Sequence, residues 1–511
     1  MRPPRTPKPH RHHCPAIYAL AIALFLSAAA GHGQTAAGAE IITADANAPS
    51  RPFPHFWEKM FGSGRAILSL RESYRRDLRE VKQATDFEYV RFHAIFHDEV
   101  GAYQEDREGH ALYNFSYVDQ VYDGLLANGV RPFVELSFMP RELAAKNILH
   151  PFWYKPNVSP PKDWDKWDQF ITAFARHLVE RYGIDEVANW YFEVWNEPNI
   201  DFWAGDPKQP TYWQLYDHTA TAIKKANSRL RVGGPATAQA AWVDAFIEHC
   251  ARNNVPLDFV STHVYGNDSA QDVFGTNENI PRDKMVCRAV NKVHEQIKAS
   301  PMPKLPLIWS EFNASYKNEP SVTDSIYMGP WLADTIRRCD GLVDIMAYWT
   351  FSDVFEEQGV VTTPFYGGYG LIAAGGIPTP AYEAFKLLHK LGDRHIALNS
   401  DSALLTLRSD GALVLAVWNY APPDQPGSPK TFIVRFKNTK AQQARVWRLD
   451  SDHGDTHLAY EKMGAPRYPT QAEIRQLRSA SELTASQTRD LKNGELNLDV
   501  PAHGLALVEL K

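Results

Sequence analysis

The chain has 511 residues, a formal net charge of −6 and a hydrophobic content of 44%. This length exceeds one typical domain and predicts a large domain accompanied by a smaller one. The composition excludes an intrinsically disordered protein, and the acidic balance disfavours nucleic acid as a partner.

The first segment has the order of a secretory leader. Small residues follow an apolar run over 16–26, and four basic residues precede it: Arg2, Arg5, Lys8 and Arg11. We expect residues 1–33 to be a signal peptide. A retained anchor is the alternative, although the apolar run is too short for a permanent transmembrane helix. Removal of the leader changes the formal charge to about −10 (−6 minus 4). The mature protein should be periplasmic or extracellular and lack a membrane span.

A short strand-like stretch over 40–44 precedes a proline-rich segment over 49–54. A single edge strand needs a partner for its backbone N–H and C=O groups. We therefore expect residues 34–50 to contribute a strand that packs on the C-terminal module.

From residue 56 onward, strand-like and helix-like segments alternate. Eight strand-like segments occur before residue 350: 61–65, 88–93, 131–137, 190–196, 229–233, 257–263, 305–311 and 343–349. Alternating βα units of this number predict an α/β protein with a closed (β/α)8 TIM barrel over 51–392. The alternative, an open doubly wound sheet, would need a longer glycine-rich loop than Gly62-Ser63-Gly64 provides.

The pattern changes after residue 391. Short alternating segments follow, with strands predicted over 403–407, 412–418, 431–436, 445–449, 495–498 and 505–510. They indicate a C-terminal antiparallel β-sandwich domain over 393–511. Thr470 and Glu473 have the spacing of a capping box and predict one short helix within it.

Three cysteines remain after leader removal, namely Cys250, Cys287 and Cys339. Their odd number and wide spacing argue against a disulfide framework and match no metal-ligand pattern. The sequence therefore predicts buried, structural thiols.

The stretch WYFEVWNEPN over 190–199 ends the fourth predicted strand. Pro198 has no N–H for a neighbouring strand, so pairing should stop and leave Glu197 directed into a cleft. An isolated glutamate of this kind would be interpreted as a structural cap. However, Glu311 ends the seventh strand in LIWSEFNAS, across the mouth of the barrel. Two facing carboxylates, one protonated and one ionised, are the groups that cleave a glycosidic bond.

Neighbouring residues suggest which carboxylate has which role. Arg91 and Tyr265 are placed to donate hydrogen bonds to Glu311, which would lower its pKa and suit a nucleophile. Glu197 lies in an apolar context that should raise its pKa, as an acid requires. Asn196 is placed to reach the sugar 2-hydroxyl.

Seven motifs carry a resemblance to glycoside hydrolase family 39, over about 56–391 and more weakly into the sandwich. They are YVRFHAIFHDEV (89–100), PFVELSFMP (132–140), WYFEVWNEPN, VGGPA (232–236), DFVSTHVY (258–265), the Glu311 segment and YWTFSDVFEE (348–357). The resemblance implies retaining hydrolysis without metal or cofactor, with Glu197 as acid/base and Glu311 as nucleophile.

Within that family the sequence is more similar to the β-xylosidase branch than to the α-L-iduronidase branch. The resemblance implies that substrate contacts fall on His93, Asn196, His263, Tyr265, Trp349, Glu356 and Glu357. Adjacent carboxylates accept hydrogen bonds from sugar diols and would repel a uronate. The alternatives are a solvated loop for the glutamate pair and ordinary core residues for the two histidines.

These observations predict a retaining β-D-xylosidase that releases terminal xylose from xylo-oligosaccharides. An α-L-arabinosidase or an exopolysaccharide-directed glycosidase would share the mechanism and differ around C5 of the sugar. A carbohydrate-binding protein without catalysis is a third hypothesis. The sequence leaves open the glycone and aglycone preference, the leader cleavage site and whether the protein forms a homo-oligomer.

Overall fold

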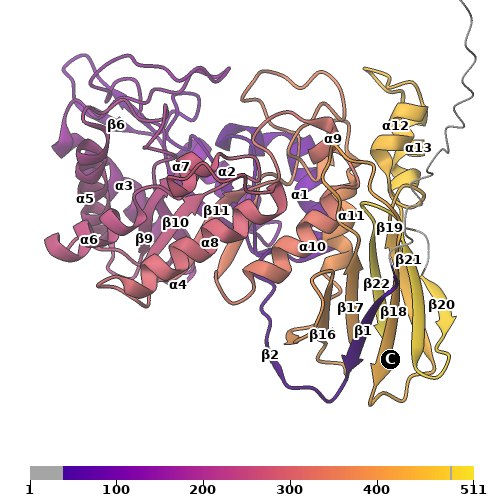
Figure 1. The fold of residues 1–511 in the computed structure, drawn as a ribbon. Coiled ribbons are helices and arrows are strands. Elements are labelled where there is room, and N and C mark those ends of the chain that lie inside the picture. The colour runs from indigo at the N-terminus through magenta and orange to yellow at the C-terminus, as the bar shows by residue number, and fades with distance from the viewer. Residues whose placement is uncertain (1–37, 484–485, 511) are drawn as a thin grey trace, which may run out of the picture. The chain divides into compact units, whose positions relative to one another are not determined.

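The computed structural model describes residues 38–483 and 486–510 (Figure 1). The predicted signal peptide, residues 1–33, lies outside the described residues. The chain divides into two units, Met1–Gly38 and Ala39–Lys511, and the description below concerns the second.

Eight parallel strands close into a barrel, which confirms the predicted fold class. Going round the barrel in chain order, they are β3 (Met60–Gly62), β4 (Tyr89–Phe92), β7 (Arg131–Leu136), β8 (Tyr191–Val194), β9 (Arg231–Thr237), β10 (Phe259–His263), β11 (Leu307–Phe312) and β12 (Ile345–Tyr348). β12 pairs with β3 through Ala347 and Met60, which completes the closure.

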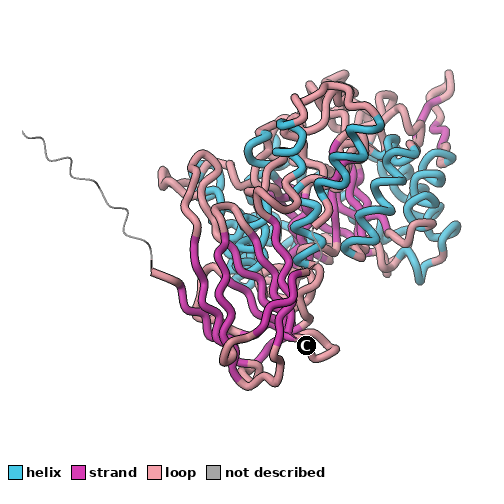
Figure 2. Tube along the Cα trace, turned by 90° about the vertical axis from the view of Figure 1, so that its right-hand side faces the viewer, coloured by secondary structure: helices cyan, strands magenta, loops and turns pink. Residues whose placement is uncertain are grey.

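Helices surround these strands (Figure 2). The longer ones are α1 (Glu72–Thr85), α2 (Ser116–Leu126), α3 (Trp164–Tyr182), α5 (Lys208–Ala226), α6 (Val243–Asn253), α8 (Arg282–Ala299), α10 (Met328–Cys339) and α11 (Pro380–Leu388). α3 buries one face, which includes Trp167, Phe170 and Phe174, residues three or four positions apart as a helical stripe requires. The Asp163 side chain accepts from the backbone N–H of Lys166 and so caps its first turn.

Several short elements lie in the loops between strands and helices. They are the hairpin β5 (Tyr103–Glu105) and β6 (Ala111–Tyr113), the pair β13 (Ile372–Ala373) and β14 (Ile377–Pro378), the 3₁₀ helices η1 (Ala66–Leu70) and η2 (Ala238–Ala240), and the helices α4 (Ile184–Val187), α7 (Ala270–Phe274) and α9 (Pro320–Thr323). Such loops at the carboxyl ends of the strands are where a barrel of this type builds its site.

The C-terminal domain is a sandwich of two sheets. The larger, antiparallel sheet runs β2 (Ser50–Pro52), β15 (Arg394–Ile396), β16 (Ala403–Leu407), β17 (Leu413–Trp418), β22 (Leu505–Leu510), β19 (Gln443–Leu449) and β20 (Gln487–Asp490). The smaller runs β1 (Glu40–Asp45), β18 (Lys430–Lys437) and β21 (Glu495–Val500). Their inner faces bury Leu415, Phe432 and Val508 in one core.

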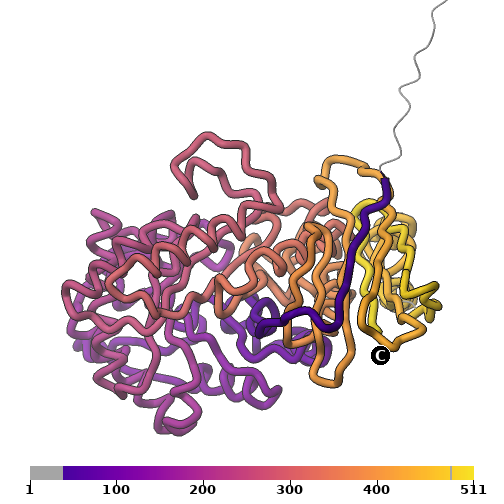
Figure 3. Tube along the Cα trace, turned by 60° about the horizontal axis from the view of Figure 1, so that its bottom comes forward, coloured from indigo at the N-terminus to yellow at the C-terminus, as the bar shows by residue number. Residues whose placement is uncertain are grey.

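The N-terminal strand joins this domain, as Figure 3 shows by its indigo trace among orange and yellow strands. β1 pairs with β18 in parallel, with Glu40 opposite Phe432, so the smaller sheet has one parallel pair. Two further helices, α12 (Thr456–Lys462) and α13 (Gln471–Ser481), complete the domain, and the predicted capping box of Thr470 and Glu473 begins α13.

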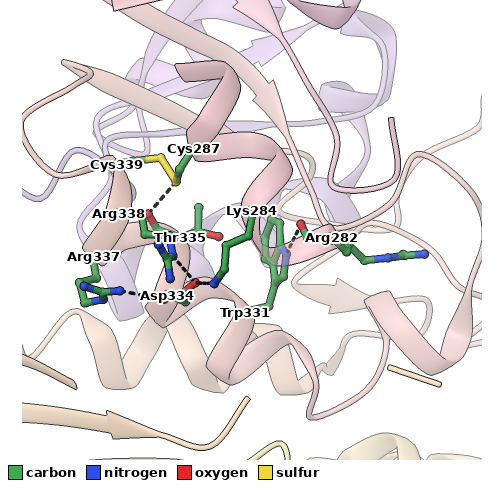
Figure 4. The surroundings of a disulfide bond; sticks show 9 residues. All are labelled: Arg282, Lys284, Cys287, Trp331, Asp334, Thr335, Arg337, Arg338 and Cys339. Carbon is green, nitrogen blue, oxygen red and sulfur yellow. Dashed lines mark hydrogen bonds and ion pairs between the residues drawn. A yellow bond between two sulfur atoms is a disulfide. The ribbon is translucent and has the colours of Figure 1, made fainter. Parts of the chain in front are cut away.

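The prediction of unlinked thiols is wrong for two of the three cysteines. Cys287 on α8 and Cys339 on α10 form a disulfide with their Cα atoms 5.3 Å apart, while Cys250 is a buried free thiol. Figure 4 shows the disulfide beside Asp334, which pairs with Lys284 of α8 (3.1 Å) and Arg338 (2.6 Å). The packing of α8 on α10 brings the cysteines together, and a separation of 52 residues gives no sign of this in the sequence.

Among residues 38–483 and 486–510, no helix is both long and apolar enough to span a membrane.

Candidate active site

A cavity of about 400 Å³ opens at the carboxyl ends of the barrel strands. Its walls include His93, Asn196, Glu197, His263, Tyr265, Glu311, Trp349 and Glu357, which are eight of the predicted site residues. Its remaining walls are His150, Phe152, Ile200, Phe202, Ala238, Gln239, Asp268, Tyr316 and Tyr369. The strand order therefore brings together residues that are as much as 264 positions apart in the sequence (357 minus 93).

Glu311 lies on β11 and its side chain is bound by two donors. Arg91 Nη1 donates to its Oε1 (2.6 Å) and the Tyr265 hydroxyl donates to its Oε2 (2.7 Å). Both bonds favour the ionised carboxylate, and the residue is only 4% exposed. The predicted contacts of Arg91 and Tyr265 with Glu311 are thus present.

Glu197 follows β8 in a different setting. Trp195 and Glu197 both adopt left-handed backbone conformations (φ 71° and 44°), which turn the chain away from the sheet after Val194. The backbone N–H of Glu197 then donates to the carbonyl of Ala236 on β9 (2.8 Å). Burial first, and then the negative charge of Glu311, hold the pKa of Glu197 well above its ordinary value.

A hydrogen-bonded chain fixes where the proton of Glu197 points. The Ser310 hydroxyl donates to Glu193 Oε1 (2.7 Å), so its oxygen is an acceptor for His263 Nε2 (3.1 Å). Burial and the charge of Arg91 lower the pKa of His263, so the imidazole is neutral and Nδ1 carries the lone pair. Because Nδ1 lies 3.0 Å from Glu197 Oε1, it accepts a hydrogen bond from the O–H of the carboxylic acid form of Glu197.

The two carboxyl groups are close enough to act on one bond. One oxygen of Glu197 and one of Glu311 lie within 4.8 Å of each other. Retaining glycosidases place their carboxyl groups about 5–5.5 Å apart, whereas inverting ones leave about 6.5–9.5 Å for a water molecule. The arrangement suits a nucleophilic Glu311 with Glu197 as the proton donor.

The comparisons with known proteins agree with this geometry. The model of the glycosyl hydrolases family 39 matches residues 40–497. A β-xylosidase of Caldicellulosiruptor saccharolyticus is 36% identical over 479 residues, which cover 89% of this chain and 95% of the relative. A β-xylosidase of Geobacillus stearothermophilus is 35% identical over 469 residues, which cover 89% and 92%. The crystal structure of a monomeric β-xylosidase from Caulobacter crescentus CB15 superposes with a TM-score of 0.84 at 35% identity, covering 93% of this chain and 99% of that one.

The chain belongs to glycosyl hydrolase family 39. It is therefore an O-glycosyl hydrolase that retains the anomeric configuration, as enzymes of this family do. Retention requires two displacements at the anomeric carbon. In the first, a carboxylate attacks and the leaving oxygen takes a proton. In the second, the same acid, now a base, deprotonates the attacking water.

Arg91 is the centre of the charge network in this family 39 site. It is fully buried and contacts Glu193 through Nε (2.6 Å), Glu311 through Nη1 (2.6 Å), and Glu135 and Asn196 through Nη2 (2.7 and 2.9 Å). Burial opposes its charge, but the surrounding carboxylates more than compensate and raise its pKa. Because Asn196 Oδ1 accepts from Arg91, the amide nitrogen is the group left to donate toward a substrate.

His93, Trp349 and Glu357 line the part of the cavity nearest to Glu311. His93 Nδ1 contacts Glu135 (2.7 Å), and its Nε2 lies 3.5 Å from Glu357 and 3.9 Å from Glu311. Burial raises the pKa of Glu357 to about 8, so this carboxyl group is largely protonated at neutral pH and can both donate and accept. Trp349 packs directly over Gly62 of β3, where a Cβ atom would lie 2.0 Å from the indole ring.

Glu356 is the one predicted substrate contact that the structure places outside the cavity lining. Its carboxylate instead accepts from Arg65 Nη1 (3.1 Å) and Arg71 Nη1 (2.5 Å). Burial alone would raise its pKa, but the two arginines outweigh burial and lower it. The neighbouring residues therefore differ: Glu357 faces the cavity, and Glu356 ties its loop to the segment that precedes α1.

The predicted site does not include Glu135 and Glu193, two carboxylates that support it. Both are fully buried, on β7 and β8, where they hold Arg91 and, through Ser310, His263. A signal was available, because charged residues in the middle of apolar strands need a buried partner. Arg91, in the apolar second strand, is that partner.

Proposed function

We propose that the enzyme is an exported β-D-xylosidase that removes terminal xylose from xylo-oligosaccharides. The observation that carries this proposal is the charge of the cavity. Among its lining residues, all of which belong to the described part of the chain, there are four carboxyl groups and no lysine or arginine. A uronic acid glycone would need a basic partner, whereas hydroxyl groups are bound by carboxyl, amide and imidazole groups.

The proposed reaction uses each group in the state that its surroundings favour. The Glu311 carboxylate attacks the anomeric carbon while Glu197 gives its proton to the glycosidic oxygen. The bond to the leaving sugar breaks, and a xylosyl ester forms on Glu311. Glu197, now ionised, takes a proton from water, whose oxygen attacks the anomeric carbon and releases β-xylose with Glu311 restored.

A panel of aryl glycosides with one leaving group tests the glycone. We expect kcat/KM for the β-D-xyloside to exceed that for α-L-arabinosides and β-D-hexosides, because xylose has no substituent at C5. NMR should show the β-anomer of xylose as the first product. A higher kcat/KM for another glycone, or α-xylose as the first product, would refute the proposal.

The order of basic, apolar and small residues at the N-terminus supports export. The disulfide between Cys287 and Cys339 is a second argument, since such bonds persist in oxidising compartments. Cell fractionation with N-terminal sequencing of the mature protein tests this part. Recovery of uncleaved protein from the cytoplasm would contradict it.

A further inference from the structure

The side chains that line the cavity near Glu311 are less exposed than those at its other end. Near Glu311 its walls are closed, and Trp349 and His93 are each 3% exposed. At the other end Tyr316 is 46% exposed, and Gln239 and Asp268 are partly accessible. Since Glu197 protonates the oxygen of the leaving group, that group must lie beyond Glu197, toward the open end.

Gln239 is brought to this end by an unusual backbone segment after β9. Ala236, Gln239 and Ala240 all have positive φ angles (52°, 60° and 49°), a conformation that is unfavourable for residues other than glycine. Asn199 holds the segment at Ala238, accepting from its N–H (2.9 Å) and donating to its carbonyl (3.1 Å). The Glu197 loop therefore positions Gln239 directly.

Asp268 lies beside Gln239 and is held by the backbone of Tyr265. Its Oδ2 accepts from the backbone N–H of Tyr265 (2.7 Å). Burial raises the pKa of Asp268 overall, although this bond and the neighbouring Gln239 side chain favour its charged form and lower the pKa. Each carboxylate oxygen has two acceptor sites, and the Gln239 amide has a carbonyl oxygen that accepts and N–H groups that donate. The pair thus presents both acceptors and a donor to the cavity.

Tyr316 supplies a flat surface at the same end. Its backbone N–H donates to Asn267 Oδ1 (3.0 Å), and its carbonyl accepts from the Tyr369 hydroxyl (2.7 Å). The backbone is thereby fixed while the ring stays exposed in the cavity wall. An exposed aromatic ring on a fixed backbone loses little conformational entropy when it binds the apolar face of a ring.

We propose that Gln239, Asp268 and Tyr316 form the leaving-group subsite and that this subsite selects a sugar unit over an apolar aglycone. The proposal rests on the proposed function for the direction of the substrate. A pyranose matches the subsite because its vicinal hydroxyls fit the amide and carboxylate pair and its C–H face fits the tyrosine ring. An apolar aglycone would cover the polar atoms of the pair without offering them hydrogen-bond partners.

The test compares two substrates that share one glycone. For Gln239→Ala and for Tyr316→Ala, kcat/KM is measured with xylobiose and with an aryl β-xyloside of good leaving group. The ratio of the two values should fall about tenfold in each variant, since each loses contacts worth about a factor of ten. Unchanged ratios, within threefold of wild type in both variants, would overturn the proposal.

Two controls separate this outcome from other causes. Tyr468→Ala removes an exposed tyrosine of the C-terminal domain, and Gln271→Ala removes an exposed glutamine of α7; neither lines the cavity, so the ratio should not change. If the wild-type enzyme cleaves neither xyloside, the proposed function fails. The subsite is then tested with the aryl glycoside and disaccharide of the glycone that the enzyme does cleave, with the same criterion.

Discussion

The ends of strands β8 and β11 carry the same side chain at facing positions, yet they surround it differently. Glu311 meets only donors, the guanidinium of Arg91 and the hydroxyl of Tyr265, so its charged form is favoured. Glu197 meets an acceptor, the lone pair of His263 Nδ1, so its neutral form is favoured. Both groups are buried, which shows that burial alone does not assign their roles. The direction of the hydrogen bonds around each carboxyl group does so.

The largest effect on activity is expected from the loss of Glu311, the carboxyl group that is bound by two donors. Glu311→Ala removes the proposed nucleophile and should lower kcat on aryl β-xylosides at least about 10⁴-fold, as for other covalent catalysts. Circular dichroism should show an unchanged fold. Activity within tenfold of wild type would mean that another group forms the covalent intermediate.

Glu197→Ala should lower activity by a factor that depends on the leaving group of the substrate. Loss of the acid should cost about 10²–10⁴-fold with poor leaving groups and far less with dinitrophenyl xyloside, whose leaving oxygen needs no proton. Added azide should restore turnover of the activated substrate and give the β-xylosyl azide, because the vacated space admits a small nucleophile. An equal loss of activity for all leaving groups would contradict the distinction between Glu197 as the acid and Glu311 as the nucleophile.

Tyr265→Phe removes one of the two donors to Glu311. Hydrogen bonds to charged groups contribute about 1.5–3 kcal/mol, so kcat/KM should fall about 10- to 100-fold. The matched control is Tyr103→Phe, which deletes a hydroxyl bonded to Glu105 outside the cavity (2.9 Å) and should leave kcat/KM unchanged. An unchanged kcat/KM in Tyr265→Phe would contradict the role of this donor.

A pair of variants at His263 tests the proton position on Glu197. Activity should fall as pH rises through the raised pKa of Glu197, because the acid is lost. In His263→Gln the amide lies near the former Nε2, so the acceptor for Glu197 is removed, its pKa falls and the basic limb moves to lower pH. His263→Asn places an amide near the former Nδ1 and should keep the limb nearer to its wild-type position. A shift to higher pH in the glutamine variant would contradict the assignment.

The smallest effect on catalysis is expected away from both strand ends. Cys287→Ser should leave kcat/KM within twofold, since the disulfide joins two outer helices of the barrel and neither cysteine lines the cavity. The 52-residue loop that it closes corresponds to about 4 kcal/mol of stability in the chain-entropy model, so the melting temperature should fall by several degrees. A calorimetric scan and one activity assay check both parts.

The candidate catalytic residues could be predicted from the sequence because they lie at strand ends. Once eight βα units were counted, a glutamate ending the fourth and another ending the seventh strand had to meet at one mouth. The same rule placed Arg91 and Tyr265 at this mouth, beside Glu311. Other features had weaker signals: β20 is exposed along its whole length and has no alternating pattern, so it was not predicted.

The direction in which loop side chains point could not be predicted from the sequence. Glu356 and Glu357 are adjacent and chemically alike, but only the positions of Arg65 and Arg71 decide that the first turns away from the cavity. The disulfide is a similar case, because it depends on how α8 packs on α10.

By itself, the sequence determined the barrel, the family and the two candidate catalytic carboxyl groups, since these follow from strand periodicity and from motifs contiguous in the chain. Only the tertiary structure decided which protons those groups hold. The chain from Glu193 through Ser310 and His263 to Glu197 joins three strands, and its hydrogen-bond directions exist only when all three are in register. Protonation depends on the field of distant neighbours, which one-dimensional spacing does not encode.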